Sequence, residues 1–349
     1  MLVLGIETSC DETAAAVVEN GRTIRSNIIA SQHDLHRPFG GVVPEVAARA
    51  HAERITAVVD EALAAAGCTP QELGGVAVVN RPGLVGALLV GIAAAKGLAL
   101  AWDLPWVAVD HIAAHVYASR LAGFDLDPHI ALIVSGGHTM LYRVEDAQKL
   151  ITLGQTSDDA AGEAFDKVAQ MLGLGFPGGP ALARCAAQGN SGALKFPRCG
   201  PKEKLEESLD FSFSGLKTAV YYHLRDPAVA RGERGKLRTL SEAERADVAA
   251  SFQEAACEIL VAKTLAACRV TGISSVAVGG GVACNRRLRE LFAAREQAQG
   301  KGMRIFFPPP ALCADNAAMT AGLAWHRLAR GERDRWDLEA DPTPKRAAF

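Results

Sequence analysis

Apolar segments of strand length follow one another at the start of the chain, and few folds are compatible with their order. Residues 2–8 and 13–20 are rich in the apolar side chains that strands bury, and the hairpin-type dipeptide Asn20-Gly21 closes the second run. A third strand-like run occupies residues 22–31. The sequence therefore predicts a three-stranded antiparallel meander that opens an α/β lobe.

A second hairpin-first arrangement begins at residue 129. Residues 129–134 form an apolar run, residues 135–139 read Ser-Gly-Gly-His-Thr, and residues 140–146 form a return strand. We expect further strands at 75–80, 106–110, 274–280 and 303–309, and helices at 44–66, 84–100, from His111 onward, and at 160–173, 178–188, 241–269, 285–297 and 315–330. The order of a strand hairpin followed by helices occurs twice in the sequence. This repetition predicts two related α/β lobes with a cleft between them.

The chain length fits this two-lobed arrangement, because 349 residues are many for one core. We assign residues 1–128 and 310–349 to a first lobe and residues 129–309 to a second. A polar insertion at about 189–240 carries ten Lys/Arg against six Asp/Glu between Lys195 and Arg238. It is interpreted either as a solvated insertion or as a basic surface that meets phosphate.

Charge and composition exclude several classes of protein. A formal net charge of −2 argues against a basic nucleic-acid-binding surface that covers the whole protein. The longest apolar stretch, residues 84–95, is too short to span a bilayer, and the first residues lack the basic start of a signal peptide. Eight cysteines without a C-x-x-C pair are typical of reduced thiols in a cytoplasmic protein.

Glycine-rich turns follow three of the apolar strands or helices, at residues 135–139, 178–180 and 279–281. Glycine lets backbone N–H groups approach an anion closely, and the third turn precedes Asn285 at a predicted helix start. Each turn alone is also explained as an ordinary tight turn. Together they favour a nucleotide site, although neither a P-loop motif nor an early G-x-G-x-x-G is present.

Two histidines, His111 and His115, lie four residues apart at the start of a predicted helix, so their rings share one face. Asp110 is a natural N-cap for this helix. Asp315, at another predicted helix start, would complete a two-histidine, one-carboxylate set suited to non-haem iron or an open zinc site, although spacing alone does not select it among the acids. The competing interpretation is a pair of ordinary core or surface histidines.

Motifs along most of the chain resemble those of one known family. They include GIETSCDETAAAVV, PEVAARAH, NRPGLVGALLVG, DHIAAH, VSGGHT, GEAFDKVAQMLGLGFPGGP, DFSFSGLKTAV, GGGVACNRRLR and PALCADNAAM. In this order they resemble TsaD, the tRNA threonylcarbamoyladenosine transferase family, in its bacterial form. The resemblance implies the actin-like ATPase fold of sugar kinases and heat-shock ATPases. It also implies transfer of a threonylcarbamoyl group from threonylcarbamoyl-adenylate to the exocyclic amine of the adenosine beside the tRNA anticodon, in tRNAs that read codons starting with A, with release of AMP.

The resemblance further implies site residues, a metal and partners. By matching motifs, His111, His115 and Asp315 would bind a divalent metal, usually iron, with zinc possible in purified protein. The adenylate would be held by Val134, Ser135, Gly136, Gly137, His138, Asp166, Gly179 and Asn285. The family works with TsaB, which pairs through the first lobe, and with the ATPase TsaE. A separate synthase supplies the intermediate. We expect residues 84–100 and 44–66 to make the TsaB contact.

The sequence departs from some relatives at two positions. Ile133 stands where archaeal and eukaryotic members carry a metal-binding tyrosine, and Ala183 replaces an acid that some members have after Gly-Gly-Pro. The first hairpin turn, which faces a phosphate in the wider fold, is acidic here because of Glu7, Asp11 and Glu12. We therefore expect weak phosphate binding at that turn.

Three other functions compete with the transferase. A metalloprotease needs a glutamate after the first histidine, where this chain has Ile112. A small-molecule kinase of the actin-like superfamily would use magnesium, whereas an imidazole pair suits softer metals. A nucleotide-binding scaffold without enzymatic activity needs no metal ligands.

Overall fold

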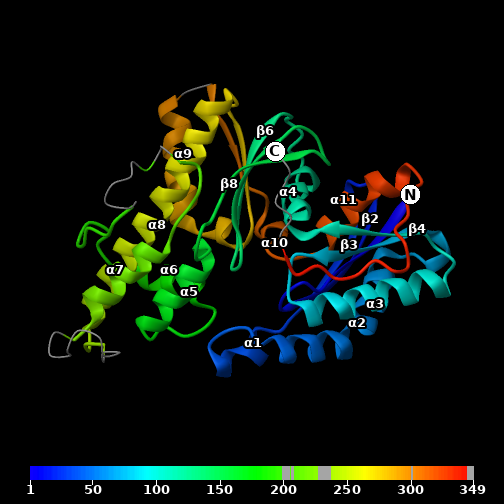
Figure 1. Ribbon diagram of the computed structural model, residues 1–349, viewed down its shortest axis with the longest axis horizontal. Coiled ribbons are helices and arrows are strands. Elements are labelled where there is room, and N and C mark those ends of the chain that lie inside the picture. The colour runs from blue at the N-terminus through cyan, green and yellow to red at the C-terminus, as the bar shows by residue number, and fades with distance from the viewer. Residues whose placement is uncertain (199–204, 206–207, 227–236, 300–301, 344–349) are drawn as a thin grey trace. The chain divides into compact units, whose positions relative to one another are not determined.

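The computed structural model describes residues 1–198, 205, 208–226, 237–299 and 302–343, and the chain forms two compact units (Figure 1). Unit 1 contains residues 1–128, 144–151 and 306–349, and unit 2 contains residues 129–143 and 152–305. Each unit is built on its own five-stranded sheet. The predicted two-lobed α/β class, with a mixed sheet and flanking helices in each lobe, is confirmed.

The sheet of unit 1 has the strand order β3-β2-β1-β4-β5. Its strands are β1 (Leu2–Glu7), β2 (Glu12–Glu19), β3 (Thr23–Ser31), β4 (Leu73–Arg81) and β5 (Trp106–Asp110). β1 pairs antiparallel with β2 and parallel with β4, so the predicted meander is confirmed. Asn20 and Gly21 adopt φ values of 51° and 69°, the left-handed conformation that made this dipeptide a hairpin signal.

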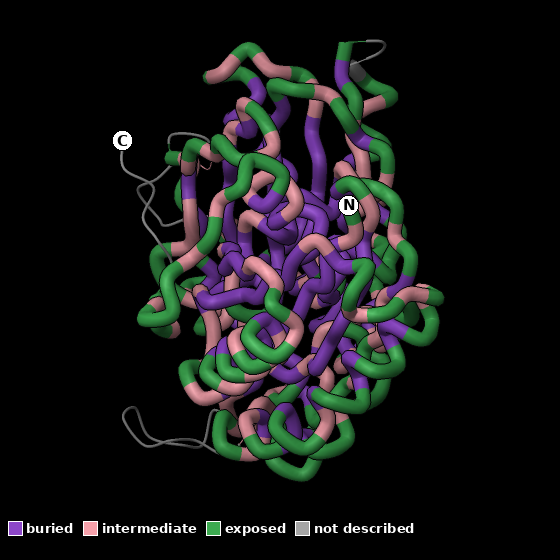
Figure 2. The backbone as a smooth tube through the Cα atoms, turned by 90° about the vertical axis from the view of Figure 1, so that its right-hand side faces the viewer, coloured by how far each residue is buried: buried purple, intermediate pink, exposed green. Residues whose placement is uncertain are grey.

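Helices cover both faces of the unit 1 sheet, because both faces of its central strands are apolar. On one face Val3 and its neighbours pack against α4 (His111–Leu121) and α11 (Ala317–Ala329). On the other face Leu4 and its neighbours pack against α2 (Pro44–Ala66) and α3 (Val85–Ala101). Figure 2 shows the strands as buried and the outer helical turns as exposed. Such continuous burial is typical of sheets with parallel pairing.

A glycine in β1 fixes how close α11 lies to the sheet. A Cβ on Gly5 would lie 2.4 Å from the carbonyl oxygen of Ala317 and 2.8 Å from the Cβ of Ala321. Only glycine therefore allows the first turn of α11 to rest on the β1 backbone. This contact places the residues just before α11, including Asp315, beside the carboxyl end of β1.

The sheet of unit 2 has the strand order β10-β9-β6-β7-β8. Its strands are β6 (His129–Val134), β7 (Thr139–Val144), β8 (Leu150–Gln155), β9 (Ser275–Gly279) and β10 (Arg304–Phe306). β6 and β9 pair in parallel. The helices of this unit are α5 (Ala161–Met171), α6 (Gly178–Ala186), α7 (Ser214–Leu224), α8 (Glu242–Thr271) and α9 (Arg286–Gln299). Ser241 and Glu244 form a capping box that starts α8.

The predicted polar insertion at 189–240 needs a correction. Phe211, Phe213 and Leu216 are buried, and α7 packs on α5 and α8. This part of the insertion belongs to the core of unit 2. Residues 199–204, 206–207 and 227–236, which carry much of the insertion's basic charge, lie outside the described residues.

Short elements complete the described chain. They are α1 (His33–His36), α10 (Pro310–Cys313) and three 3-10 turns, Arg37–Phe39, Pro70–Glu72 and Gly281–Cys284. β10 is shorter than the predicted strand 303–309, because prolines at 308–310 lack the N–H that a ladder needs. Within the described part of the chain, no helix combines the length and apolar character needed to cross a membrane.

Candidate functional site

Three side chains that the sequence analysis singled out meet at one edge of the unit 1 sheet. His111 and His115 lie on the first turns of α4, directly after β5, and Asp315 lies just before α11. The side chain of Asp110 accepts hydrogen bonds from the backbone N–H groups of Ile112 and Ala113, at 2.9 and 3.0 Å. The predicted N-cap is therefore confirmed, and it fixes where α4 begins and which way the two imidazoles point.

The geometry of the three side chains is that of a possible ligand set. His115 Nε2 lies 3.0 Å from Asp315 Oδ1, and His111 Nε2 lies 3.7 Å from the same oxygen. Both histidines are buried, and their rings meet edge to face with centroids 4.6 Å apart. The three ligand atoms all lie within 4.8 Å of one another.

These distances fit a metal ion. Metal–ligand bonds of about 2.0–2.2 Å place neighbouring ligand atoms about 3.0 Å apart at right angles and about 3.4 Å apart in a tetrahedron. The observed 3.0 and 3.7 Å lie close to these values. Two imidazoles and one carboxylate leave coordination positions for substrate or water.

A fourth residue, which the sequence analysis placed in an acidic turn, contacts this set. Glu7 is the last residue of β1 and is fully buried. Its Oε2 lies 3.0 Å from His111 Nδ1, and its Oε1 accepts a 2.8 Å hydrogen bond from the Ser9 N–H. Burial opposes a charged His111 ring, but the carboxylates of Glu7 and Asp315 outweigh it and raise the pKa of His111 to about 9.

A second group of ligand-type side chains lies farther along the same hairpin turn. His33 Nε2 lies 3.2 Å from Glu12 Oε1 and 3.7 Å from Asp11 Oδ2. Burial raises the pKa of Glu12; the hydrogen bond from His33 opposes that rise, and the nearby Asp315 and Asp11 carboxylates add to it. The raised pKa favours the protonated form of Glu12, so this carboxyl group contributes less negative charge than an exposed one would. Weak phosphate binding at this turn stays a prediction.

In unit 2, hydrogen bonds and close backbone packing link the three glycine-rich turns. The turn after β6 is closed by a hydrogen bond from the Ser135 N–H to the His138 carbonyl at 2.8 Å, and the start of α5 packs on it. A Cβ on Gly162 would lie 2.5 Å from the Ser135 oxygen, and one on Gly280 would lie 2.3 Å from the Val134 oxygen. The carboxyl ends of the adjacent parallel strands β6 and β9 therefore carry these turns together.

Two further predicted binding residues, Asp166 and Asn285, make hydrogen bonds that stabilise the backbone at this edge of the unit 2 sheet. Asp166 Oδ1 accepts hydrogen bonds from the N–H groups of Gly178 and Gly179, at 2.9 and 3.1 Å, where α6 begins. Asn285 caps α9 by accepting from the Leu288 N–H, and its side-chain amide donates to Gln253 at 2.8 Å. No neighbouring atom lies within 4 Å of where a Cβ would stand on Gly136, Gly137 or Gly179, so this backbone is open to close approach.

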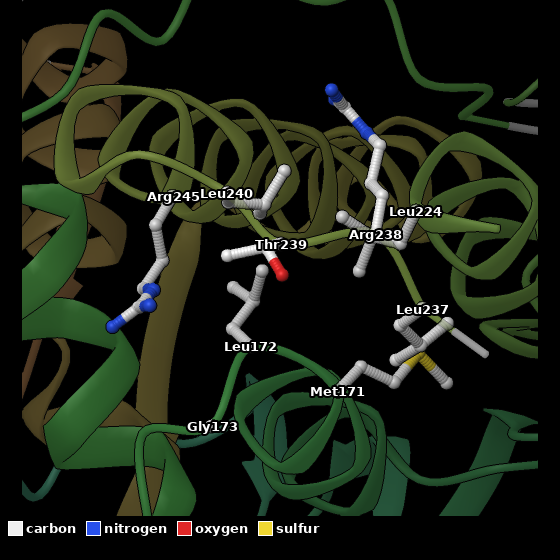
Figure 3. Close-up of a pocket in the computed structure, with 9 residues that line it drawn as sticks. All are labelled: Met171, Leu172, Gly173, Leu224, Leu237, Arg238, Thr239, Leu240 and Arg245. Atoms are coloured by element: carbon white, nitrogen blue, oxygen red, sulfur yellow. The ribbon is translucent and has the colours of Figure 1, made fainter. Parts of the chain in front are cut away.

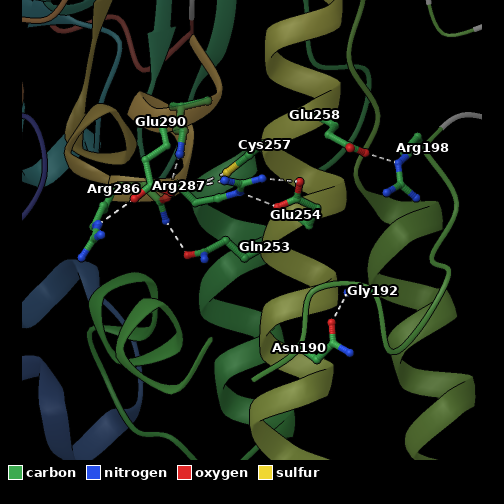
Figure 4. Close-up of polar contacts among 12 residues, drawn as sticks. Asn190, Gly192, Arg198, Gln253, Glu254, Cys257, Glu258, Arg286, Arg287 and Glu290 are labelled. Atoms are coloured by element: carbon green, nitrogen blue, oxygen red, sulfur yellow. Dashed lines mark hydrogen bonds and ion pairs between the residues drawn. The ribbon is translucent and has the colours of Figure 1, made fainter. Parts of the chain in front are cut away.

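Figure 4 shows the polar contacts behind this edge. Arg287 makes a two-pronged ion pair with Glu254 of α8, at 2.6 and 2.8 Å, and also contacts Glu290. This pairing fixes α9 on α8. The sequence analysis missed Gln253, which precedes Glu254 and orients Asn285, because its partner lies 32 residues away.

A separate hollow of about 190 Å³ lies elsewhere in unit 2 (Figure 3). It is lined by Met171, Leu172, Gly173, Leu224, Leu237, Arg238, Thr239, Leu240 and Arg245. None of these residues belongs to the glycine-rich edge.

Comparison with known proteins now assigns the family. The sequence model of TsaD, tRNA N6-adenosine threonylcarbamoyltransferase, matches residues 23–322. The chain belongs to the TsaD family. As a TsaD member it is a transferase of tRNA modification, which confirms the transferase prediction, and nothing favours the kinase, the metalloprotease or the scaffold.

Relatives of this TsaD chain match it over almost its whole length. The tRNA N6-adenosine threonylcarbamoyltransferase of Geobacter sp. (strain M21) is 51% identical over 342 residues, which are 98% of this chain and 96% of that protein. The protein of the same name from Clostridium perfringens (strain SM101 / Type A) is 48% identical over 342 residues, 98% of this chain and 97% of that one. Insertions or losses of whole domains are thus absent from these alignments.

Solved structures place the TsaD chain in the wider fold. HypF of T. kodakarensis matches with a TM-score of 0.60 at 15% identity, over 94% of this chain and 47% of that one. Component A of the (R)-2-hydroxyglutaryl-CoA dehydratase of Acidaminococcus fermentans matches with a TM-score of 0.53 at 16% identity, over 94% of this chain and 99% of that one. At this identity the likeness concerns the fold alone, and it confirms the predicted actin-like ATPase class.

Proposed function

We propose that this chain transfers the threonylcarbamoyl group from threonylcarbamoyl-adenylate to the exocyclic amine of the adenosine beside the anticodon, in tRNAs that read codons starting with A. The amine nitrogen forms a bond to the carbamoyl carbon, the bond from that carbon to the phosphate oxygen breaks, and AMP leaves. A proton is lost from the amine. Membership of the TsaD family, at about half-identity over the whole chain, is the observation that carries this proposal.

The donor is already activated, so the protein needs no nucleophile of its own. AMP is a good leaving group, and the catalytic task is to orient the amine and to stabilise charge on the carbonyl oxygen. The open backbone at Gly136, Gly137 and Gly179 supports binding of the adenylate phosphate and ribose in unit 2. In the proposal Val134, Ser135, His138, Asp166 and Asn285 complete that site.

His111, His115 and Asp315 are proposed to bind one divalent metal ion, Fe²⁺ in the cell. Their donor set and their mutual distances support this assignment. When bound, such an ion supplies Lewis acidity toward the threonylcarbamoyl group or anchors its threonyl carboxylate. The chain's own part is to hold the three donors in place.

The partner protein TsaB is proposed to cover α3 in unit 1. The exposed residues of α3 are Val85, Leu89, Ala93, Gly97, Leu100 and Ala101, and none of them has a polar side chain. Val85, Leu89 and Leu100 are 53, 52 and 73% exposed. An apolar stripe on the outer side of a helix marks an interaction surface, since a helix that is apolar all round is normally buried. TsaE, tRNA and a separate synthase, acting together in the cytoplasm, complete the proposed system.

The reaction is tested by single-turnover transfer of labelled threonylcarbamoyl from its adenylate to unmodified tRNA, with TsaB and TsaE present. We expect transfer by the wild type and joint loss of bound metal and transfer in His111→Ala, His115→Ala and Asp315→Ala. His33→Ala, in α1 beside the neighbouring acidic turn, is the matched control and should keep both. Full activity in the three ligand variants would refute the metal assignment, and an inactive wild type would refute the reaction.

The partner surface is tested by a charge substitution. Leu89→Glu should weaken TsaB binding by about 30-fold or more, as loss of a central apolar contact does. Val270→Glu places the same charge on α8 in unit 2, where Val270 is 76% exposed, and should leave binding unchanged. Isothermal titration calorimetry measures the affinity of both variants for TsaB, and equal affinities would contradict a TsaB contact on α3.

A further inference from the structure

Glu7 is a fully buried carboxylate beside the proposed metal ligands and is not itself one of them. Glu7 is the last residue of β1. In the sheet β4 lies next to β1 and β5 lies next to β4, and His111 directly follows β5. Its two oxygens have different partners: Oε1 accepts from the Ser9 N–H, and Oε2 faces His111 Nδ1 at 3.0 Å. Ser9 Oγ lies 3.1 Å from the same ring nitrogen. Two polar groups therefore converge on the side of the ring opposite Nε2.

Chemistry decides which partner donates at this contact. An ionised carboxylate can only accept hydrogen bonds, so Nδ1 of His111 must carry the proton that lies between them. In a neutral ring this leaves Nε2 unprotonated, with its lone pair on the side of Asp315. The other tautomer would set the lone pair of Nδ1 against the carboxylate and put a proton where a metal would bind.

The two histidines of the pair differ in this respect. Within the described chain, His115 Nδ1 is buried and has no hydrogen-bond partner, so on that side of the ring only packing sets its orientation. His111 is oriented by a charged partner. An imidazole that donates to a carboxylate is also the more basic ligand, because the carboxylate stabilises positive charge on the ring.

A buried carboxylate needs compensating charge, and the arrangement indicates its source. Moving an ionised carboxyl group out of water is costly unless a positive charge or strong hydrogen bonds offset the loss of hydration. When both histidines bind a metal they are neutral, and Glu7 and Asp315 then bring two negative charges to the pair. A divalent cation balances this total.

We propose that Glu7 is a positioning residue of the metal centre: it holds His111 in the tautomer that presents Nε2 and, with Asp315, matches the charge of a divalent ion. This inference rests on the metal assignment of the proposed function. Partners of this kind change metal affinity by about 10–100-fold when they are replaced.

The test measures metal binding without any turnover. Metal-free full-length chain is titrated with Co²⁺ against a competing chelator, and the visible absorption of the bound Co²⁺ is recorded. Glu7→Gln keeps the shape of the side chain and removes its charge. We expect about 10–100-fold weaker Co²⁺ binding and a shifted visible spectrum in this variant.

Two further variants sharpen the result. Glu12→Gln makes the same substitution beside the same hairpin turn, where the partner is His33 and not His111, and should leave the spectrum unchanged and the affinity nearly so. Glu7→Asp restores the charge on a shorter side chain and should recover part of the lost affinity. Circular dichroism melting of each variant shows that it is folded.

The outcomes separate the two proposals. Wild-type affinity and an unchanged spectrum in Glu7→Gln, while His111→Ala and Asp315→Ala lose the metal, would overturn the role of Glu7 and leave the metal ligands standing. An equal loss in Glu12→Gln and Glu7→Gln would also overturn it, because a general electrostatic effect would then suffice. A wild type that binds no metal would overturn both.

Discussion

Single glycines decide how closely backbone segments approach in unit 2, and Gly280 combines such an approach with a positive φ. It has a φ of 87°, a conformation that side chains avoid, and its missing Cβ would lie 2.3 Å from the Val134 carbonyl oxygen. Gly281, the next residue, has open space around the same position. Two adjacent glycines thus have different reasons to be there, and only the first is required by contact.

This difference gives a stability prediction with its own control. Gly280→Ala should lower the free energy of unfolding by about 2–4 kcal/mol, because strain in φ adds to a backbone clash. Gly281→Ala should change it by about 0.5 kcal/mol or less. Urea unfolding of the two variants measures both, and similar midpoints would contradict the close approach of Gly280 to β6.

Residues that act together at the metal set could be found from the sequence only where their relation is local. His111 and His115 are one helical turn apart, so spacing alone put their rings on one face. Asp315 lies 200 residues from His115; its place at a predicted helix start made it a candidate, and only the family resemblance selected it among the acids. Glu7 was noticed as an acid of the hairpin turn, but its burial and its contact with His111, 104 residues away, have no local signal.

At the scale of elements, Asp110 links the cap of α4 to the site. Asp110→Ala should destabilise unit 1 by about 1 kcal/mol, because two N–H groups of α4 lose their acceptor. It should also weaken metal binding, since the first turn carries His111. Asp110→Asn keeps an acceptor oxygen and is the control. Thermal melting and Co²⁺ titration test the pair, and equal effects of the two substitutions would assign the loss to charge and not to capping.

Elements with a clear apolar period or a cap were predicted well, and those with mixed composition were not. The opening meander, α2 with Gly67 after it, and α8 with its capping box all carry local signals. β8 and α7 were missed because their apolar residues are interleaved with polar ones and pack only against distant parts of unit 2. Burial of Phe211 and Phe213 is a tertiary effect that no short window of sequence contains.

At the scale of the whole molecule, the last described residues protect an open edge of the unit 1 sheet. β5 is an edge strand, and its Ala108 donates to Asp334 at 2.6 Å and accepts from Arg327 at 2.8 Å. Arg327 also pairs with both oxygens of Asp334. The Arg327–Asp334 pair thus provides hydrogen-bond partners for backbone groups of β5 that could otherwise pair with a strand of another chain.

The pair predicts a pH dependence of stability. Burial opposes ionisation of Asp334, but Arg327 and the Ala108 N–H outweigh it and lower the pKa of this carboxyl group. Since the folded pKa lies below the unfolded value of about 3.9, the stabilisation is complete above that pH and is lost as the pH falls through the folded value. Asp334→Asn should therefore be less stable than the wild type at pH 6, by about 1–3 kcal/mol.

The difference between wild type and Asp334→Asn should shrink steadily below about pH 4, where the wild-type carboxyl group also becomes neutral. Urea midpoints at pH 6, 5, 4 and 3 follow it. Asp337→Asn removes an exposed partner of Arg335 in the same segment and should show little effect at any of these values. A constant difference over the whole range would mean that the charge of Asp334 does not stabilise the fold.

Because unit 1 is assembled from segments far apart in the chain, its proposed metal ligands are made at different times. Ribosomes add about 5–20 residues per second, so the 200 residues between His115 and Asp315 represent about 10–40 s of synthesis. During that interval the growing chain carries the two proposed imidazole ligands without Asp315, while unit 2 is being completed in between. A message cut short within unit 2 would therefore lack the carboxylate of the proposed metal set, and only translation past Asp315 supplies all three proposed ligands.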